Sequence, residues 1–155
     1  MKIIVQRVKD ASVHVEGKSV CSMEKHGLLI YFAVRKGDNE KNADFLAEKA
    51  AGLRIFEDEK GKMNLSVKDV DGAILIVPEF TLYGDCSKGK RPGFDLSAPP
   101  IEAGRLFEYF ADKIKTFHKN VFTGIFRSHM HVHSTNDGPV TFIIEHPLNQ
   151  KTENR

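Results

Sequence analysis

The chain has 155 residues, 41% of them hydrophobic and 28% charged, which is ordinary for one globular domain with a sizeable core. No segment is long and apolar enough to span a bilayer and no cleavage-site pattern follows the N-terminal residues, so we expect a cytoplasmic protein without membrane contact. Cys21 and Cys86 are too few for a disulfide framework, and the formal net charge of +2 permits nucleic-acid binding without requiring it.

The first part of the chain predicts short strands. Residues 2–8 and 11–16 read as two strands, with Lys9-Asp10 as a tight connection, and apolar and polar side chains alternate in the second. A turn at Gly17-Lys18 leads into a short third strand, so these segments predict an antiparallel meander. Residues 27–34 are nearly all apolar, which is typical of a strand buried on both faces.

A helix and further strands follow. Residues 39–53 carry apolar side chains at helical spacing with charges between them, which predicts an amphipathic helix. Residues 53–56 and 63–65 read as strands on either side of a polar hairpin loop. After a turn at Asp71-Gly72, residues 73–77 predict a central strand. We expect the chemistry where this strand ends, in the segment PEFTLYG at residues 78–84.

The second half of the chain predicts another helix and the final strands. Ser97 is the expected N-cap, and Pro99 and Pro100 stand at the helix start, where a missing N–H is harmless. This helix should end near His118. Its expected core face consists of Ala103, Leu106, Phe107, Phe110, Ile114 and Phe117. The remaining predicted strands are residues 121–126, 129–134 and 140–145.

These elements predict a single α/β domain, because most connections are short and no internal repeat or linker occurs. We expect two stacked or barrel-like, largely antiparallel β-sheets with two main amphipathic helices, arranged in α/β/β layers. The domain should cover residues 1–147, followed by a polar tail at residues 148–155.

The segment NDGPVT at residues 136–141 has two open interpretations. The favoured one is a turn, since Asn, Asp and Gly tolerate positive φ and Pro fixes the exit direction. The other is that Gly138-Pro139 holds a rigid run of backbone polar groups that reads a ligand's chirality with no side chain in the way. Its X-Pro bond can be cis at small cost.

Two groups of basic side chains are also open to more than one interpretation. Lys88, Lys90 and Arg91 lie in a glycine-containing loop, which is either a solvated surface loop or a phosphate-binding segment. His129, His131 and His133 alternate as one face of a strand would, and clustered histidines can bind zinc. No carboxylate or cysteine completes a ligand set nearby, so we favour a polar strand face and expect no metal.

Candidate nucleophiles are Thr81, Thr141 and Cys86, each without an adjacent base in a recognised local signature. A threonine hydroxyl without a general base is a poor nucleophile. We therefore expect Thr81 to position substrate or water through a hydrogen bond.

The motif FTLYG at residues 80–84, with Lys90-Arg91-Pro92 downstream and the segment at residues 136–141, resembles the D-aminoacyl-tRNA deacylase family, long called D-tyrosyl-tRNA deacylases. The resemblance covers nearly the whole chain, with further blocks at residues 6–8, 11–13, 54–56 and 61–65. It implies a homodimer that uses no cofactor and hydrolyses the ester between a D-amino acid and the 3′ adenosine of tRNA. Glycyl-tRNA mischarged on the alanine tRNA should also be a substrate.

The resemblance also implies roles for individual residues. Gly138-Pro139 would be cis, reach into the partner's site, capture the α-amino group with its carbonyls and exclude L side chains. The backbone N–H of Phe80, together with the residue Thr81, would hold the scissile ester and its developing oxyanion. The terminal 2′-hydroxyl of the tRNA would activate the attack.

Further contacts are implied around that site. Arg7 would hold the Gly-Pro element, and Met130 would line the adenosine pocket. Asn136 and Thr141 belong to the same substrate-binding motif. The tRNA phosphates would meet Lys88, Lys90 and Arg91.

Departures from the family pattern keep alternatives open. The family usually has Ser-Gln where this chain has Pro78-Glu79, and small or acidic residues where it has residues 127–129. An acidic Glu79 near an anionic substrate should cost affinity unless it is paired or turned away. The alternatives are a relaxed or animal-type deacylase that acts on L-alanyl-tRNA, and a catalytically weakened tRNA-binding dimer. Arg7 and the intact residues 136–141 favour the D-specific enzyme.

Overall fold

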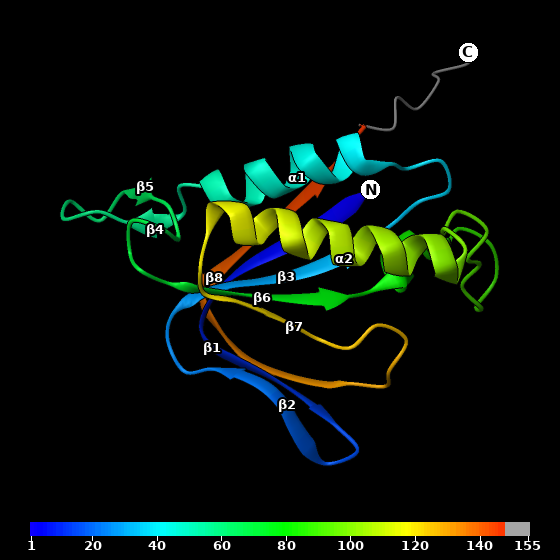
Figure 1. The fold of residues 1–155 in the computed structure, drawn as a ribbon, viewed down its shortest axis with the longest axis horizontal. Helices are drawn as coiled ribbons and strands as arrows, with labels where there is room; N and C mark the ends of the chain where they lie inside the picture. The colour runs from blue at the N-terminus through cyan, green and yellow to red at the C-terminus, as the bar shows by residue number, and fades with distance from the viewer. Residues whose placement is uncertain (148–155) are drawn as a thin grey trace.

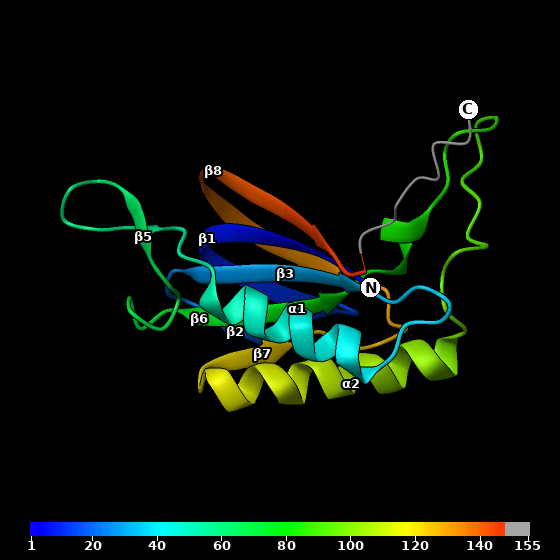
Figure 2. The same ribbon diagram turned by 90° about the horizontal axis from the view of Figure 1, so that it is seen from above.

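The computed structural model describes residues 1–147, and the polar tail expected at residues 148–155 lies outside them. Two helices cover one face of a strongly twisted sheet (Figure 1 and Figure 2). The elements are β1 (Lys2–Val15), β2 (Lys18–Met23), β3 (Gly27–Ala33), α1 (Glu40–Gly52), β4 (Phe56–Glu57), β5 (Met63–Leu65), β6 (Ala73–Pro78), the 3-10 helix η1 (Phe80–Tyr83), α2 (Pro100–Phe117), β7 (Val121–Thr123) and β8 (His131–Glu145). No helix in residues 1–147 has the length and apolarity that crossing a membrane requires.

Strand β1 organises the main sheet because three strands pair with it. One of its edges pairs with β8, and the other pairs first with β3 and then with β2, all antiparallel. Beyond β3 the sheet continues with β6 and β7 in parallel. The thiol of Cys21 on β2 lies 3.6 Å from the carbonyl oxygen of Thr123 on β7, so the two ends of the sheet nearly meet. This confirms the predicted α/β fold with two helices and a barrel-like sheet; β4 and β5 form the small second sheet.

The prediction of separate strands within β1 was wrong. Lys9 and Asp10 are exposed inside one continuous strand, where the register with β8 shifts between Val8 and Ala11. A β-bulge of this kind accommodates extra residues without ending the strand. The predicted three-stranded meander was wrong for the same reason, because its first two strands are one strand, β1. Its antiparallel pairing of residues 11–15 with the short strand after Gly17-Lys18 is present as β1 with β2.

The favoured prediction of a turn at residues 136–139 was wrong as well, because these residues lie inside β8. Gln6 pairs with Thr141 and Val8 pairs with Asn136, so residues 137–140 of β8 stand opposite Arg7 alone. The four residues therefore form a wide bulge in the strand. Its backbone is displaced from the ladder that β1 provides.

The sheet buries apolar side chains on both faces, as the composition of β3 predicts. Leu28 and Ile30 belong to the core between the sheet and the helices, together with residues of α1 and α2. Leu29 belongs to a second core inside the barrel, where it packs with Leu75 of β6 and Val13 of β1. Alternation along each strand thus fills two layers.

The ends of several elements differ from the predictions. Helix α1 begins as expected, since Asn39 caps it and forms a capping box with Asn42. The N-cap of α2 is Pro99, so the prediction that Ser97 caps this helix was wrong. Phe117 is 37% exposed and lies outside the core. Other strand ends also differ: β4 begins at Phe56 and β7 ends at Thr123, so both are shorter than expected. The predicted strands 129–134 and 140–145 are one longer strand, β8, which begins at His131.

The two ends of the molecule carry different features. Helix η1 and the loop of residues 85–93 lie at one end, and the β4–β5 hairpin lies at the other (Figure 2).

Candidate active site

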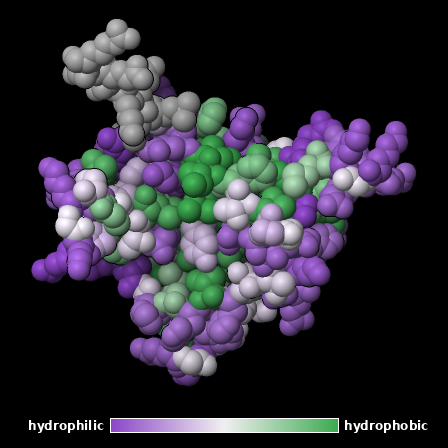
Figure 3. Space-filling model, turned by 180° about the vertical axis from the view of Figure 1, so that it is seen from behind, coloured by the Kyte–Doolittle hydropathy of each residue, from purple (hydrophilic) through white to green (hydrophobic). Residues whose placement is uncertain are grey.

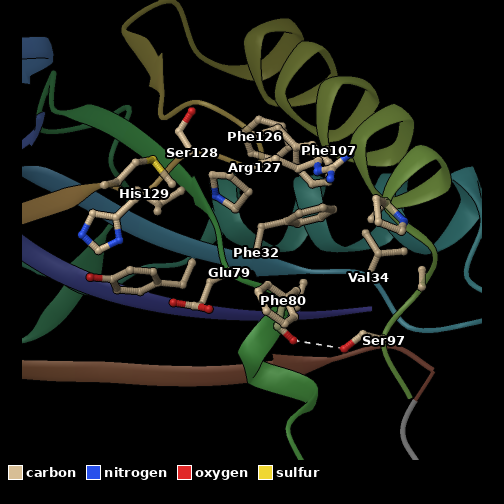
Figure 4. A pocket seen from close by; sticks show the side chains of 18 of the residues that line it. Phe32, Val34, Glu79, Phe80, Ser97, Phe107, Phe126, Arg127, Ser128 and His129 are labelled. Atoms are coloured by element: carbon tan, nitrogen blue, oxygen red, sulfur yellow. Dashed lines mark hydrogen bonds between the residues drawn. The ribbon is translucent and has the colours of Figure 1, made fainter. Parts of the chain in front are cut away.

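A cavity of about 560 Å³ opens between the last residues of β3 and β6, the start of α2 and the segment that joins β7 to β8. Its wall is largely aromatic and aliphatic, with Phe32, Phe107 and Phe126 on the side of α2 (Figure 4). Glu79, Phe80 and His129 bring polar groups and an exposed ring to its rim. A volume of this size is in the range of small-molecule sites and fits a nucleoside.

Helix η1 places the backbone N–H of Phe80 beside this cavity. The N–H of Glu79 donates to the carbonyl of Phe32 at 2.8 Å, which fixes the start of η1 to β3. The side chain of Glu79 then accepts hydrogen bonds from the N–H of Thr81, at 3.1 Å, and from the Thr81 hydroxyl. The first N–H groups of a helix have no intrahelical acceptor, so the N–H of Phe80 is available to a ligand.

The proton of the Thr81 hydroxyl is thus directed at Glu79. What the hydroxyl offers to a ligand is its lone pairs, because a hydroxyl has one donor and two acceptor positions. The sequence analysis missed the contact between Glu79 and Thr81, although a side-chain acceptor just before a short helix is the usual sign of an N-cap.

Contacts on three sides hold η1 in place. The hydroxyl of Ser97 donates to the carbonyl of Phe80 at 3.2 Å (Figure 4). Lys2 donates to the carbonyl of Leu82 at 3.3 Å, and the phenol of Tyr83 donates to the carboxylate of Glu145 at 3.1 Å. Burial, reinforced by the nearby negative charge of Glu145, raises the pKa of Tyr83.

Tyr31 adds a neutral donor to the cavity wall. It lines the cavity from β3, next to Glu79. Burial raises the pKa of its phenol, and the carboxylate of Glu79 raises it further. The phenol therefore keeps its proton at neutral pH.

Met130, which was predicted to line an adenosine pocket, lies in the wall of this cavity. Its sulfur accepts a weak hydrogen bond from the N–H of Ile125 at 3.4 Å. A Cβ added at Gly124 would come within 2.8 Å of the same sulfur, so a glycine makes room for the thioether. The short segment between β7 and β8 is shaped around this side chain.

Arg7 holds the bulge of β8 from behind. It is only 6% exposed and donates to the carbonyl of Asp137 at 3.0 Å and to that of Ile55 at 2.8 Å. Its guanidinium also lies 3.6 Å from the carboxylate of Asp137. The bulge is therefore tied to both β1 and the segment before β4.

The exposed part of the bulge is Gly138-Pro139, whose peptide bond is cis. Gly138 has a φ of +141°, and a Cβ at this position would lie 2.6 Å from the side chain of Val140. Only glycine fits this backbone. Asn136 accepts from the N–H of Val140 at 2.9 Å, and its amide donates to Thr141 at 3.3 Å. Asn136 and Thr141 thus support the bulge from within β8.

The cavity and the bulge do not meet within one chain. Arg7 pairs with Leu28 near the start of β3, whereas the cavity lies beside Phe32 near its end. Four residues separate these positions on β3, which corresponds to roughly 13 Å along the strand. The structure brings Phe80, Thr81 and Met130 together at one end and Arg7, Gly138 and Pro139 together further along the sheet.

The remaining predicted residues are distributed at the surface. Lys88, Lys90 and Arg91 are exposed in the loop that two hydrogen bonds between Asp85 and Gly93 close. His129 lies in the cavity wall outside β8, so the prediction of three histidines on one strand face was wrong. Within residues 1–147, no three His, Cys, Asp or Glu side chains converge as metal ligands.

Comparison with known proteins bears on these features. The profile described as D-Tyr-tRNA(Tyr) deacylase matches residues 4–145. The chain belongs to this family. A D-aminoacyl-tRNA deacylase of Geotalea uraniireducens is 52% identical over 155 residues, which is 100% of this chain and 99% of the relative. One of Thermotoga petrophila is 52% identical over 145 residues, 94% of this chain and 97% of the relative.

Solved structures agree with the deacylase family fold. A structure titled c-Myc DNA unwinding element binding protein is 35% identical with a TM-score of 0.89, and the match covers 95% of this chain and 99% of that one. A structure titled as a probable eukaryotic D-amino acid tRNA deacylase has a TM-score of 0.80 at 16% identity, covering 92% and 97%. At this identity the second likeness shows the fold alone.

Proposed function

We propose that the chain is a D-aminoacyl-tRNA deacylase, a homodimer that hydrolyses the ester between a D-amino acid and the terminal ribose of tRNA. The observation that carries the proposal is the free N–H at the start of η1, which stands at the rim of a nucleoside-sized cavity in a chain of the deacylase family. The products are free D-amino acid and uncharged tRNA. Because its substrate is aminoacyl-tRNA, we assign the reaction to the cytoplasm.

The terminal adenosine occupies the cavity, with its base against Met130 and the aromatic wall. This places the acyl ester at the rim, beside η1. The N–H of Phe80 donates to the carbonyl oxygen of the ester, where negative charge develops when the carbonyl carbon is attacked. A water molecule attacks the carbonyl carbon with the assistance of the terminal 2′-hydroxyl, while the lone pairs of Thr81 accept a hydrogen bond from that water. The bond from the carbonyl carbon to the 3′ oxygen of the ribose breaks, and the departing 3′ oxygen takes the proton that the water loses.

The partner subunit supplies the chirality filter. Gly138-Pro139 is exposed and lies roughly 13 Å along the sheet from its own cavity, so it serves a second copy of the chain. Its backbone carbonyls receive the α-amino group of the substrate, and the side chain of an L-amino acid strikes the same backbone. Glycine has no side chain to strike it, so glycyl-tRNA mischarged on the alanine tRNA is also cleaved.

The surface opposite the helices supports association with a second copy. Apolar side chains gather near the centre of this face (Figure 3). Phe142 and Ile143 of β8 are exposed, with 71% of Ile143 accessible. Exposed apolar areas of this kind mark interaction sites.

The decisive experiment measures release of D-tyrosine and L-tyrosine from the corresponding tyrosyl-tRNAs, with a chelator present and a control without enzyme. Glycyl-tRNA and L-alanyl-tRNA, each on the alanine tRNA, are tested in parallel. We expect release of D-tyrosine and glycine and retention of both L-amino acids. Release of L-alanine would instead identify the relaxed or animal-type enzyme. Binding of tRNA without release of any amino acid would identify a binding dimer and contradict the proposal.

A further inference from the structure

We propose that the rings of Phe80 and Phe94 form a stacking platform for the two cytidines that precede the terminal adenosine of tRNA. The inference rests on the proposed function, because it extends the path of the bound tRNA end outward from the cavity. It assigns a binding role to Phe94, a residue that is not part of the cavity wall or of the bulge in β8.

The two rings form an exposed pair. Their centroids are 5.1 Å apart with an angle of 59° between the rings. Phe80 is 57% exposed and Phe94 is 40% exposed, so both rings are accessible to solvent. Aromatic pairs that only complete a core are buried, as Phe32 and Phe110 are.

A glycine permits this arrangement. A Cβ added at Gly84, directly after η1, would lie 3.2 Å from the ring of Phe94 and 2.9 Å from the carbonyl oxygen of Thr81. The ring therefore packs closely on the end of η1. The Ser97 hydroxyl on the carbonyl of Phe80 holds the same region from the side of α2. The platform has a fixed position relative to the cavity.

The charges beside the platform match a nucleic acid. Phe94 directly follows Gly93, where the loop closes on Asp85, and this loop carries Lys88, Lys90 and Arg91. All three cations are exposed. Two acidic residues are near in sequence: Asp85 accepts a hydrogen bond from the N–H of Ser87 at 2.9 Å, and Asp95, which follows Phe94, is exposed, so the three cations outnumber the carboxylates here.

Stacking rings beside a cationic segment are the usual means of binding single-stranded nucleic acid. A base resting on each ring and phosphates near the loop would guide the single strand into the cavity, where Phe80 is also part of the wall. The charge complementarity favours the tRNA end over an apolar segment of a second protein, which would gain nothing from the three cations.

The test compares three substrates that carry the same D-tyrosyl ester: on adenosine alone, on the trinucleotide cytidine-cytidine-adenosine, and on full tRNA. Phe94→Leu keeps an apolar side chain against Gly84 but removes the flat ring, and Phe94→Tyr keeps the ring. For Phe94→Leu we expect the ratio of kcat/KM for the trinucleotide to that for the adenosine ester to fall about tenfold, through KM. Phe94→Tyr should restore the wild-type ratio.

Phe45→Leu is the matched control, because Phe45 is 44% exposed on α1, away from the cavity and the loop. Its ratio should equal that of the wild type. An unchanged ratio in Phe94→Leu, or an equal loss on all three substrates, would overturn the inference while leaving the proposed function intact. Dissociation of Phe94→Leu into monomers in sedimentation would also overturn it, since the platform would then be covered by a second copy. Failure of the wild type on every substrate would instead refute the proposed function.

Discussion

The carboxylate of Glu79 accepts hydrogen bonds from both the backbone N–H and the hydroxyl of Thr81, the first at 3.1 Å. The carboxylate therefore binds two donors at the start of η1. The partial positive charge at a helix N-terminus also stabilises a negative charge at this position. An acidic residue at this position was expected to cost affinity unless it was paired or turned away. Glu79 is hydrogen-bonded to two neutral donors, and no cation within residues 1–147 forms an ion pair with it, so its negative charge remains. It also fixes the direction in which the Thr81 hydroxyl presents its proton.

Replacement of Glu79 should separate these effects. In Glu79→Ala the Thr81 hydroxyl loses its acceptor and turns freely, and we expect kcat to fall about tenfold, the usual effect of losing a hydrogen bond to a charged group. Glu79→Gln keeps an amide oxygen that accepts the same two bonds, so its kcat should stay within about threefold of the wild type. Single-turnover deacylation of D-tyrosyl-tRNA measures both.

A double-mutant comparison shows whether Glu79 acts through the Thr81 hydroxyl. Thr81→Val removes the hydroxyl but keeps the N–H that Glu79 caps, and it should lower kcat, as should Thr81→Ala. Adding Glu79→Ala to Thr81→Val should cost little more, because the coupled group is already gone. If Glu79→Ala lowers kcat by the same factor in the wild-type enzyme and in Thr81→Val, Glu79 acts only as a helix cap.

The backbone of the bulge in β8 gives a second prediction. Gly138→Ala places a methyl group 2.6 Å from Val140 at a φ of +141°, so it should lower the free energy of unfolding by about 2 kcal/mol. The methyl group also lies on the surface that we propose to receive the α-amino group. The rate of D-tyrosine release should therefore fall even under conditions in which the variant is still fully folded.

Gly61→Ala is the matched control for this prediction. Gly61 also has a positive φ, of +70°, but nothing lies within 4 Å of its Cβ position, in the β4–β5 hairpin. It carries the backbone cost without the clash, and its deacylation rate should equal that of the wild type. Urea unfolding and initial rates on D-tyrosyl-tRNA test both variants. A Gly138→Ala enzyme with the wild-type rate would exclude this residue from the filter.

Much of the fold could be predicted because hydrophobic patterns are local. The run at residues 27–34 and the helical spacing at residues 39–53 indicated β3 and α1 directly. The long strands could not be recognised, because Lys9-Asp10 and Gly138-Pro139 have the composition of turns. In β1 and β8 these residues lie in bulges, which depend on the pairing of two distant strands.

The site could be predicted only in part for a related reason. Motif residues such as Phe80, Thr81 and Met130 could be identified from the resemblance; Phe80 and Met130 line one cavity, and Thr81 follows Phe80 in η1. The contact of Glu79 with Thr81 and that of Ser97 with Phe80 depend on how η1 turns and on where α2 begins. Local patterns gave Ser97 a capping role, whereas the tertiary structure uses its hydroxyl to hold η1.

The anchor of η1 at Tyr83 predicts a pH dependence of stability. Burial and the charge of Glu145 raise the pKa of Tyr83, so the folded protein keeps a proton that the unfolded chain releases near pH 10. Stability should therefore be complete below that pH and fall as the pH rises further. Tyr83→Phe has no such proton, so its stability should fall less steeply between pH 9 and roughly pH 11.

At pH 8 the same variant should be less stable than the wild type by about 1 kcal/mol, because it lacks the hydrogen bond to Glu145. Urea unfolding at a series of pH values measures both effects. Parallel curves for the wild type and Tyr83→Phe above pH 9 would show that Tyr83 does not contribute to the alkaline loss of stability.

The loop of residues 85–93 gives a prediction about salt. Each cation that neutralises a phosphate adds about 0.7 to 0.9 to the slope of the logarithm of affinity against the logarithm of salt concentration. The triple variant replaces Lys88, Lys90 and Arg91 by alanine. It should bind tRNA more weakly, and the slope should be reduced by about 2. D-tyrosyl-adenosine has no phosphate, so its KM should change little. Replacing three other exposed lysines by alanine, Lys41 and Lys49 of α1 together with Lys68, provides the matched control for lost charge. An equal reduction of the slope in that control would show that the total charge of the protein, and not this loop, attracts the tRNA.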